Sequence, residues 1–192
     1  VVELENPPRP TCEEIERVLP AFLGTIQQMP PAFSALKVQG QRAYHLARRG
    51  DVVELQPRPV EIHRLAVVRY AYPALQLEVC CGSGTYIRSL GRDVAQALGT
   101  AAVMSALVRT AIGDFRIDEA CDLDELSAGK IESHLQPPTR ALAQLPLIQL
   151  TDEEIRRIAS GMMLPNRWNS DAAEIAAVDG QGRLVAILAP RS

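Results

Sequence analysis

The sequence predicts an α+β fold, in which a mixed or antiparallel sheet is flanked by helices and followed by a small β-rich module. Apolar residues recur at helical spacing over residues 12–22 and 87–98, whereas over 74–81 they alternate with polar residues. A Pro-containing linker near residue 138 then precedes a further helix and strand pair. We therefore predict two domains, residues 1–138 and 139–192. A hydrophobic content of 47% in 192 residues is sufficient for an ordinary core.

The first predicted helix begins at a capping box. Thr11 is the expected N-cap and Glu14 the third helical residue, and apolar side chains over 15–22 follow at helical spacing. The pattern predicts a helix of about 11 residues. The Pro-Pro pair at 30–31 ends this regular structure.

Residues 31–50 form a basic segment that contains no Asp or Glu. We predict a short strand, a turn at Gly40 and a helix over 41–49. The basic side chains are Lys37, Arg42, Arg48 and Arg49. Residues 111–160, by contrast, carry ten Asp and Glu against five Lys and Arg. Such asymmetry suits a polyanionic partner despite the net charge of -3, and a solvated basic surface is the alternative interpretation.

Strand patterns dominate the middle of the chain. They cover residues 52–55, 60–70 and 74–80, and the period-two alternation of the last of these indicates one covered and one wetter face. After the Gly82-Ser83-Gly84 turn, a helix is predicted to run to Gly99. Residues 103–117 return to strand-like composition, and a helix capped by Asp122 is expected next.

The C-terminal module is predicted to contain a helix over 152–160, stopped by Gly161, and a strand, turn and strand over 174–190. A module of about 45 residues barely buries a core by itself, so we expect it to pack on the rest of the chain.

Cofactor and compartment signals are weak. The four cysteines lack a C-x-x-C spacing and the three histidines lack a ligand spacing, so we predict no metal, no other cofactor and four buried thiols. No apolar run approaches the ~20 residues that span a bilayer, and no leader is evident. We expect a cytoplasmic monomer with no membrane partner.

The stretch Cys80–Gly99, CCGSGTYIRSLGRDVAQALG, carries the strongest chemical signal. Its glycines do not fit a dinucleotide or phosphate loop, because the third glycine of G-x-G-x-x-G would fall at Ile87. Tyr86 instead offers a stacking surface and a weak acid or base, and Arg88 a fixed cation. Because a helix N-terminus disfavours a cation, Arg88 calls for a carboxylate or phosphate. A core tyrosine with a structural salt bridge is the alternative.

Four stretches together show a family resemblance: PPAFSALKVQGQRAYHLARRG, RPVEIHRL, LEVCCGSGTYIRSLGRDVAQALGT and ALVRTAIGDF. In this order and spacing they resemble the bacterial B-type tRNA pseudouridine synthases (tRNA pseudouridine-55 synthases), which isomerise uridine in the T-arm stem-loop (TΨC loop) of tRNA. The resemblance covers about residues 1–135 and is specific. The tail, from LTDEEIRRIASGMMLP onward, resembles more loosely the family's small PUA-like RNA-binding module.

The resemblance implies roles for individual residues. Tyr86 would pack on the flipped uracil and is a candidate for removing its C5 proton, and Leu107 would line the same pocket. Arg88 would pair with the catalytic aspartate. The segment 31–50 would be a thumb-like insertion over the T-loop. Its RNA-binding residues would be Lys37, Arg42, Tyr44, Arg48 and Arg49.

The family's catalytic aspartate belongs to a G-x-L-D-P-x-A-T-G motif, which does not occur in the printed sequence. Asp124, in LDELSAG, lacks the neighbouring Pro and Thr and is expected to be an exposed first-turn acid. We therefore predict that the chain is the C-terminal two-thirds of such an enzyme, with a partial catalytic domain, and inactive alone. The alternatives are a non-catalytic RNA-binding or RNA-folding module and, less favoured, a small-molecule enzyme using the Gly-rich turn.

Overall fold

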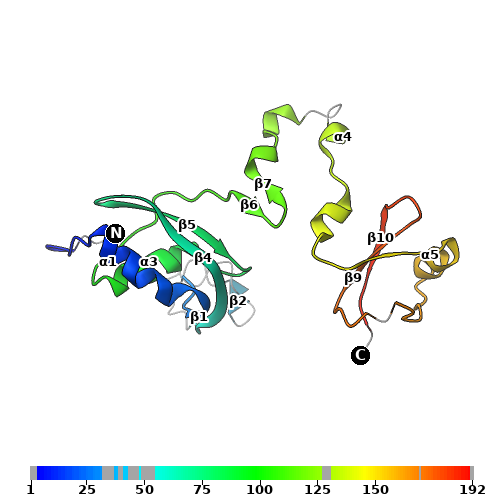
Figure 1. The fold of residues 1–192 in the computed structure, drawn as a ribbon, viewed down its shortest axis with the longest axis horizontal. Helices are drawn as coiled ribbons and strands as arrows, with labels where there is room; N and C mark the ends of the chain where they lie inside the picture. The colour runs from blue at the N-terminus through cyan, green and yellow to red at the C-terminus, as the bar shows by residue number, and fades with distance from the viewer. Residues whose placement is uncertain are drawn as a thin grey trace. The chain divides into compact units, whose positions relative to one another are not determined.

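The computed structural model describes residues 4–31, 37–38, 41–42, 48, 55–126, 131–168 and 170–190. These residues fall into two compact units, Val1–Leu107 and Val108–Ser192, which Figure 1 draws and which are described separately below. The functional boundary predicted between residues 138 and 139 lies inside the second unit and stays a prediction.

The first helix forms as its capping signal predicts. Helix α1 (Cys12–Val18) continues into the 3-10 helix η1 (Leu19–Phe22). The Glu14 N–H donates to the Thr11 hydroxyl oxygen at 3.2 Å, and the Glu14 carboxylate accepts from the Thr11 N–H at 2.7 Å. Both ends of the capping box are therefore made, and the predicted length is confirmed.

An antiparallel sheet of three strands forms the centre of the first unit. Strand β4 (Arg58–Ala71) lies between β1 (Gly24–Gln28) and β5 (Ala74–Cys81), in the order β1-β4-β5. The register pairs Gln28, the last residue of β1, with Arg58, the first of β4. This agrees with the predicted mixed or antiparallel sheet, although strand β1 was not predicted.

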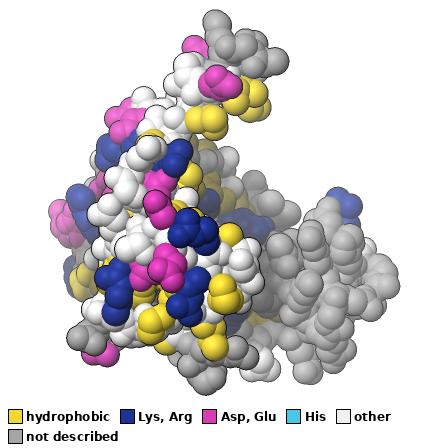
Figure 2. All heavy atoms as spheres, turned by 90° about the vertical axis from the view of Figure 1, so that its right-hand side faces the viewer, with side chains coloured by type: hydrophobic (Ala, Val, Ile, Leu, Met, Phe, Trp, Pro, Cys, Tyr) yellow, Lys and Arg dark blue, Asp and Glu magenta, His cyan; other side chains and the backbone are white. Residues whose placement is uncertain are grey.

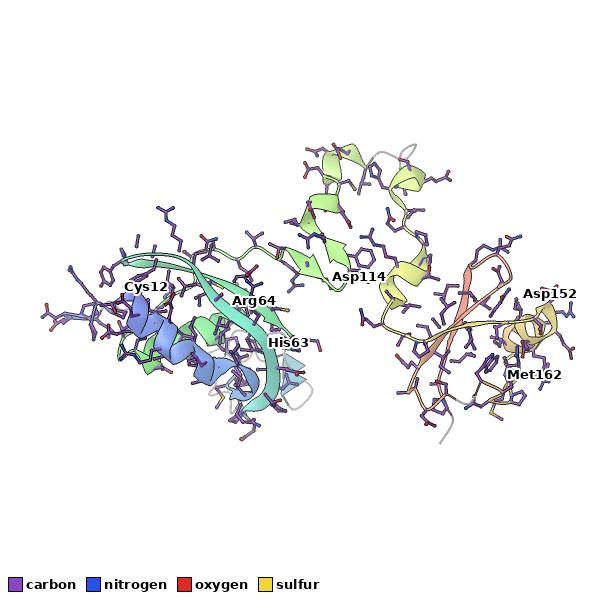
Figure 3. All side chains as sticks on the ribbon, in the orientation of Figure 1. Cys12, His63, Arg64, Asp114, Asp152 and Met162 are labelled. Atoms are coloured by element: carbon purple, nitrogen blue, oxygen red, sulfur yellow. The ribbon has the colours of Figure 1, made fainter. Side chains whose placement is uncertain are left out.

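Helices α1 and α3 (Ile87–Ala97) pack on this sheet and share one hydrophobic core with it. The fully buried members of this core come from α1, η1, β4 and α3, and they are Ile15, Leu19, Ile62, Leu65, Leu90 and Val94. The opposite side of the hairpin is polar. His63 and Arg64, labelled in Figure 3, are exposed on β4, and the Arg64 guanidinium lies 3.1 Å from the Glu78 carboxylate on β5. The predicted wetter face is therefore present.

Two short strands are described within the basic segment. Strand β2 (Lys37–Val38) pairs antiparallel with β3 (Gln41–Arg42). The prediction of a helix from Gln41 is therefore wrong at its start, because Gln41 and Arg42 pair with β2 instead of beginning a helix. The predicted turn at Gly40 lies outside the described residues. Arg48 is helical. The strand expected over 52–55 lies almost entirely outside the described residues.

The chain that follows α3 is less regular than its composition suggested. Residues 101–110 have no strand, and only the two-residue strands β6 (Ala111–Ile112) and β7 (Phe115–Arg116) follow. Many apolar side chains here are exposed, so there is no covered face against which a longer strand could pack. Arg140 supports the hairpin instead: its guanidinium donates to the Asp114 carbonyl at 3.0 Å and lies 4.9 Å from the centre of the Phe115 ring.

The helix expected after Asp122 is also shorter. A three-residue 3-10 helix, η3 (Leu123–Glu125), follows, and the Asp122 side chain makes no capping hydrogen bond to it. Helix α4 (Ile131–His134) is a single turn. Two further 3-10 helices are η2 (Ile117–Glu119) and η4 (Pro138–Leu142).

The C-terminal part of the second unit confirms the predicted helix and strand pair. Helix α5 (Asp152–Ala159) precedes the antiparallel strands β9 (Ile175–Val178) and β10 (Leu184–Leu188). A third strand, β8 (Leu147–Gln149), pairs parallel with β9 and was not predicted. All four residues of β9 are buried, so this central strand carries the core of the module.

The prediction that the four cysteines are buried is wrong. Cys80 is exposed, and Cys12, Cys81 and Cys121 are half-buried free thiols. Cys80 lies on the polar face of β5, where strand alternation outweighs the general preference of cysteine for the interior. Of the helices that the structure describes, none combines the length and apolarity that crossing a bilayer would require.

Candidate functional site

The turn between β5 and α3 presents Tyr86. The Gly82 N–H donates to the Glu61 carbonyl at 2.8 Å, and the Thr85 hydroxyl donates to the Gly82 carbonyl at 3.0 Å. Gly84 has a φ of 81°, a left-handed conformation that side chains other than glycine rarely adopt. Together these features fix a tight turn, and Tyr86 follows it as the N-cap of α3.

A residue from β1 holds the Tyr86 backbone. The Tyr86 N–H donates to the side-chain oxygen of Gln28 at 2.8 Å, and Gln28 is only 1% exposed. The sequence analysis missed Gln28, because neither its spacing nor its composition marks a contact between residues that are 58 positions apart.

Two further bonds attach the same helix to the same strand end. The Met29 carbonyl accepts from the Ser89 hydroxyl at 2.8 Å and from the Arg92 guanidinium at 3.2 Å. Arg92 is itself paired with the adjacent Asp93 at 2.8 Å. The first two turns of α3 are therefore fixed to the end of β1 by side chains from both elements.

Arg88 lies in the first turn of α3, as predicted, and is exposed. That turn contains no acidic residue, so the helix itself provides no local compensation for the cation. The predicted pairing of Arg88 with a catalytic carboxylate stays a prediction.

Leu107 is the last residue of the first unit and is 56% exposed. It lies in the irregular segment 101–110. The expectation that it lines the pocket of Tyr86 stays a prediction.

The basic segment is described in part. Lys37 and Arg42 are opposite one another in the β2-β3 hairpin, and Arg48 is exposed. Tyr44 and Arg49 lie outside the described residues. The hairpin pairing brings two cationic positions together, which is consistent with the predicted binding of RNA phosphates.

The surface charges of the second unit are interleaved. Figure 2 faces the side that carries α5 and β10 and shows Lys and Arg beside Asp and Glu. Two ion pairs of this unit are Arg167 with Glu154 and Arg183 with Asp179, both at 2.7 Å. The Arg167 hydrogen bond and the Thr151 N–H lower the pKa of Glu154 to about 2. Within the described ranges, no group of three or more His, Cys, Asp and Glu could hold a metal ion.

Comparison with known proteins begins with a family model. Residues 1–87 match the model described as TruB family pseudouridylate synthase, N-terminal domain. The chain is 37% identical over 186 residues to a tRNA pseudouridine synthase B of Dehalococcoides mccartyi, covering 95% of this chain and 62% of that protein. It is 41% identical over 191 residues to the tRNA pseudouridine synthase B of Bradyrhizobium diazoefficiens, covering 93% and 55%. The chain thus spans between half and two thirds of the length of these relatives.

Solved structures show the same fold. A crystal structure of a Cbf5-Nop10-Gar1 complex is similar with a TM-score of 0.73 at 24% identity, covering 94% of this chain and 55% of that one. A structure of an H/ACA RNP bound to a substrate RNA containing 2'-deoxyuridine is similar with a TM-score of 0.68 at 21% identity, covering 93% and 54%. The predicted α+β class is confirmed.

Over residues 1–87 the sequence is similar to the N-terminal domain of the pseudouridylate synthases. Over nearly its whole length it is similar to the TruB proteins, the tRNA pseudouridine synthases B.

The predicted position of the chain within the family is wrong. Residues 1–87 match the N-terminal domain of the family, so the N-terminal catalytic region is present and the chain is not the C-terminal two-thirds. The expectation of inactivity rested on the absent motif and has no support from the relatives.

Proposed function

We propose that this chain acts in the isomerisation of uridine to pseudouridine in the T-arm stem-loop of tRNA. The observation that carries the proposal is its identity of 37% and 41%, over nearly its whole length, to proteins named tRNA pseudouridine synthase B. The motif CCGSGTYIRSL supports the same reaction, since it folds into a fixed turn that presents Tyr86.

The reaction requires that the base leave the stack. The bond between N1 of uracil and C1′ of ribose breaks, the base rotates, and a bond forms between C5 and C1′ while C5 loses a proton and N1 gains one. Flipping the nucleotide costs a few kcal/mol, and stacking on an aromatic ring returns about 1–3 kcal/mol. Tyr86 provides that ring and is positioned to remove the C5 proton, with Leu107 beside the base.

Arg88 holds the nucleophilic carboxylate in its ionised form in this proposal. A guanidinium is always charged, so it stabilises a carboxylate at any pH at which the protein folds. The reaction is a redox-neutral rearrangement that needs no metal or organic cofactor.

RNA binding is assigned to two places. The thumb-like segment 31–50 contacts phosphates through its Lys and Arg side chains, with Tyr44 in its packing, and residues 139–192 form a PUA-like module with a second contact to the tRNA. RNA binding through such contacts weakens as the salt concentration rises. Each phosphate contact steepens the slope of log K against log[salt] by about one unit. In this proposal the protein works as a monomer in the cytoplasm, where tRNA is found.

Release of tritium from T-arm RNA carrying [5-³H]uridine tests the proposal. The protein carrying this chain should release tritium, and Tyr86→Phe should lower turnover by about 100-fold or more with RNA affinity within about twofold. RNA binding without tritium release would instead support a non-catalytic RNA-binding module. Turnover unchanged in Tyr86→Phe would contradict the role of Tyr86 in removing the C5 proton.

A further inference from the structure

Gln28 has an unusual combination of burial and incomplete hydrogen bonding. It is 1% exposed at the end of β1, its side-chain oxygen accepts the Tyr86 N–H at 2.8 Å, and its Nε2 has no hydrogen-bond partner among the described residues. A buried amide donor without a partner is unfavourable, and an apolar side chain of similar shape would avoid that cost. Folding stability alone therefore does not explain a glutamine here.

The side-chain oxygen of Gln28 supports the turn that carries Tyr86, because it accepts the Tyr86 N–H. Tyr86 is the N-cap of α3, with φ −96° and ψ 103°, and its side chain makes no capping bond. The first N–H groups of a helix have no partners within the helix. The Gln28 oxygen satisfies the Tyr86 N–H from another strand, so it fixes the backbone that sets the direction of the tyrosine ring.

Neighbouring contacts fix the helix but not the tyrosine. The Ser89 hydroxyl and the Arg92 guanidinium both donate to the Met29 carbonyl. These bonds hold α3 against the end of β1 at positions further along the helix than Tyr86. The Tyr86 N–H is bonded by Gln28. Ser89, which is also 1% exposed, provides a matched control on the same helix and the same strand end.

We propose that Gln28 is a positioning residue for Tyr86, retained for the orientation of the tyrosine and not for stability. The proposal rests on the function proposed above. Because misplacing a reacting group by about 1 Å can cost 100-fold in rate, the loss of this single bond should appear in turnover. It should not appear in RNA affinity, since Gln28 is buried.

Gln28→Met and Ser89→Ala, compared in the protein carrying this chain, test the proposal. Gln28→Met should lower kcat about 10- to 100-fold and leave the Kd for T-arm RNA within about twofold. Its melting temperature should change less than that of Ser89→Ala, because removal of the unpartnered Nε2 offsets the loss of the Tyr86 hydrogen bond. Ser89→Ala should lower the melting temperature by a few degrees and leave kcat within about twofold, because it removes a buried hydrogen bond but leaves Tyr86 in place. Unchanged kcat in Gln28→Met, or parallel losses of stability and kcat in both variants, would overturn the proposal.

If Gln28→Met folds poorly, a second variant, Gln28→Glu, and the hydrogen-exchange rate of the Tyr86 amide still test the proposal. Gln28→Glu retains an acceptor oxygen for Tyr86, so its kcat should be closer to that of the unsubstituted protein than the kcat of Gln28→Met. The Tyr86 amide should exchange slowly in the unsubstituted protein and in Gln28→Glu, and faster in Gln28→Met. A fast Tyr86 amide in the unsubstituted protein contradicts the proposal. Absence of tritium release from that protein would contradict the proposed function, while the exchange data would still report on the Gln28 contact.

Discussion

Helices α3 and α5 begin in opposite ways. At the start of α5, the Thr151 hydroxyl accepts the Glu154 N–H and the Glu154 carboxylate accepts the Thr151 N–H, and three acidic residues fill the first turn. At the start of α3 there is no side-chain cap and no acid, and Arg88 is present instead. Yet α3 buries four residues and α5 buries none. Helix α5 is stabilised locally, whereas α3 depends on packing and on a contact from β1.

The difference is consistent with the role proposed for Arg88 at the start of α3. An acidic first turn would complement the helix dipole, but it would also repel the carboxylate that Arg88 is proposed to hold. The locally unfavourable start is compensated by the buried face of α3 and by the bonds from Gln28 and Met29. A conflict with local rules at a functional position is a general expectation for natural proteins.

Truncating the buried face of α3 should have the largest effect on stability. Leu90 is 1% exposed, so Leu90→Ala should lower the free energy of unfolding of the first unit by about 2–5 kcal/mol. The corresponding change in α5, Ile155→Ala, should cost less because Ile155 is only half-buried. Denaturant unfolding followed by NMR signals from each unit measures both changes. Equal losses would break the contrast between the two helices.

Removing the cap of α5 should have a smaller effect, in the second unit. Thr151→Ala deletes one half of the capping box and should lower stability by about 0.5–2 kcal/mol. Thr151→Ser keeps the hydroxyl and is the matched control. If Thr151→Ala left the amide exchange of the first turn of α5 unchanged, local capping would not be what stabilises this helix.

The smallest expected effect is the pH dependence of the Glu154–Arg167 pair. The Arg167 guanidinium bonds both carboxylate oxygens, at 2.7 and 2.9 Å, and this hydrogen bonding is the main cause of the lowered pKa of Glu154. Because the folded pKa is about 2 and the ordinary value is 4.5, the stabilisation is present above pH 4.5 and is lost as the pH falls toward 2. Arg167 is half-exposed, so the contribution is modest.

An NMR titration of Glu154 checks this prediction. Its carboxyl should titrate near pH 2 in the unsubstituted protein and closer to 4.5 in Arg167→Ala. Arg183→Ala, which removes a different ion pair of the same unit, should leave the Glu154 titration unchanged. Titration of the native Glu154 near 4.5 would refute the assignment.

Sequence patterns predicted the elements whose signals are local. The capping box at Thr11 and the alternation in β5 each lie within a few consecutive residues, and both are present. The capping box at Thr151 has an equally local signal but was not predicted. The placement of Tyr86 and Arg88 at a helix start was predicted for the same reason, since the Gly-rich turn adjoins a helical repeat.

The features that the sequence analysis missed depend on distant partners. Strand β8 is three residues long and is defined by its pairing with β9, and the Gln28–Tyr86 bond joins residues far apart in the chain. The segment after residue 101 was predicted as strand from its composition, but no sheet is available there to pair with it. The composition of a segment does not show whether a second strand is available to pair with it.

Strand β8 also determines where a fragment of the C-terminal module could begin. It covers one edge of β9: the Ala176 N–H donates to the Pro146 carbonyl at 2.9 Å, and the Leu150 N–H donates to the Val178 carbonyl at 2.8 Å. A fragment that started after Gln149 would leave the backbone groups along that edge open to pairing with other molecules, which is a common route to aggregation. Autonomous expression of this module therefore requires a first residue at or before Pro146.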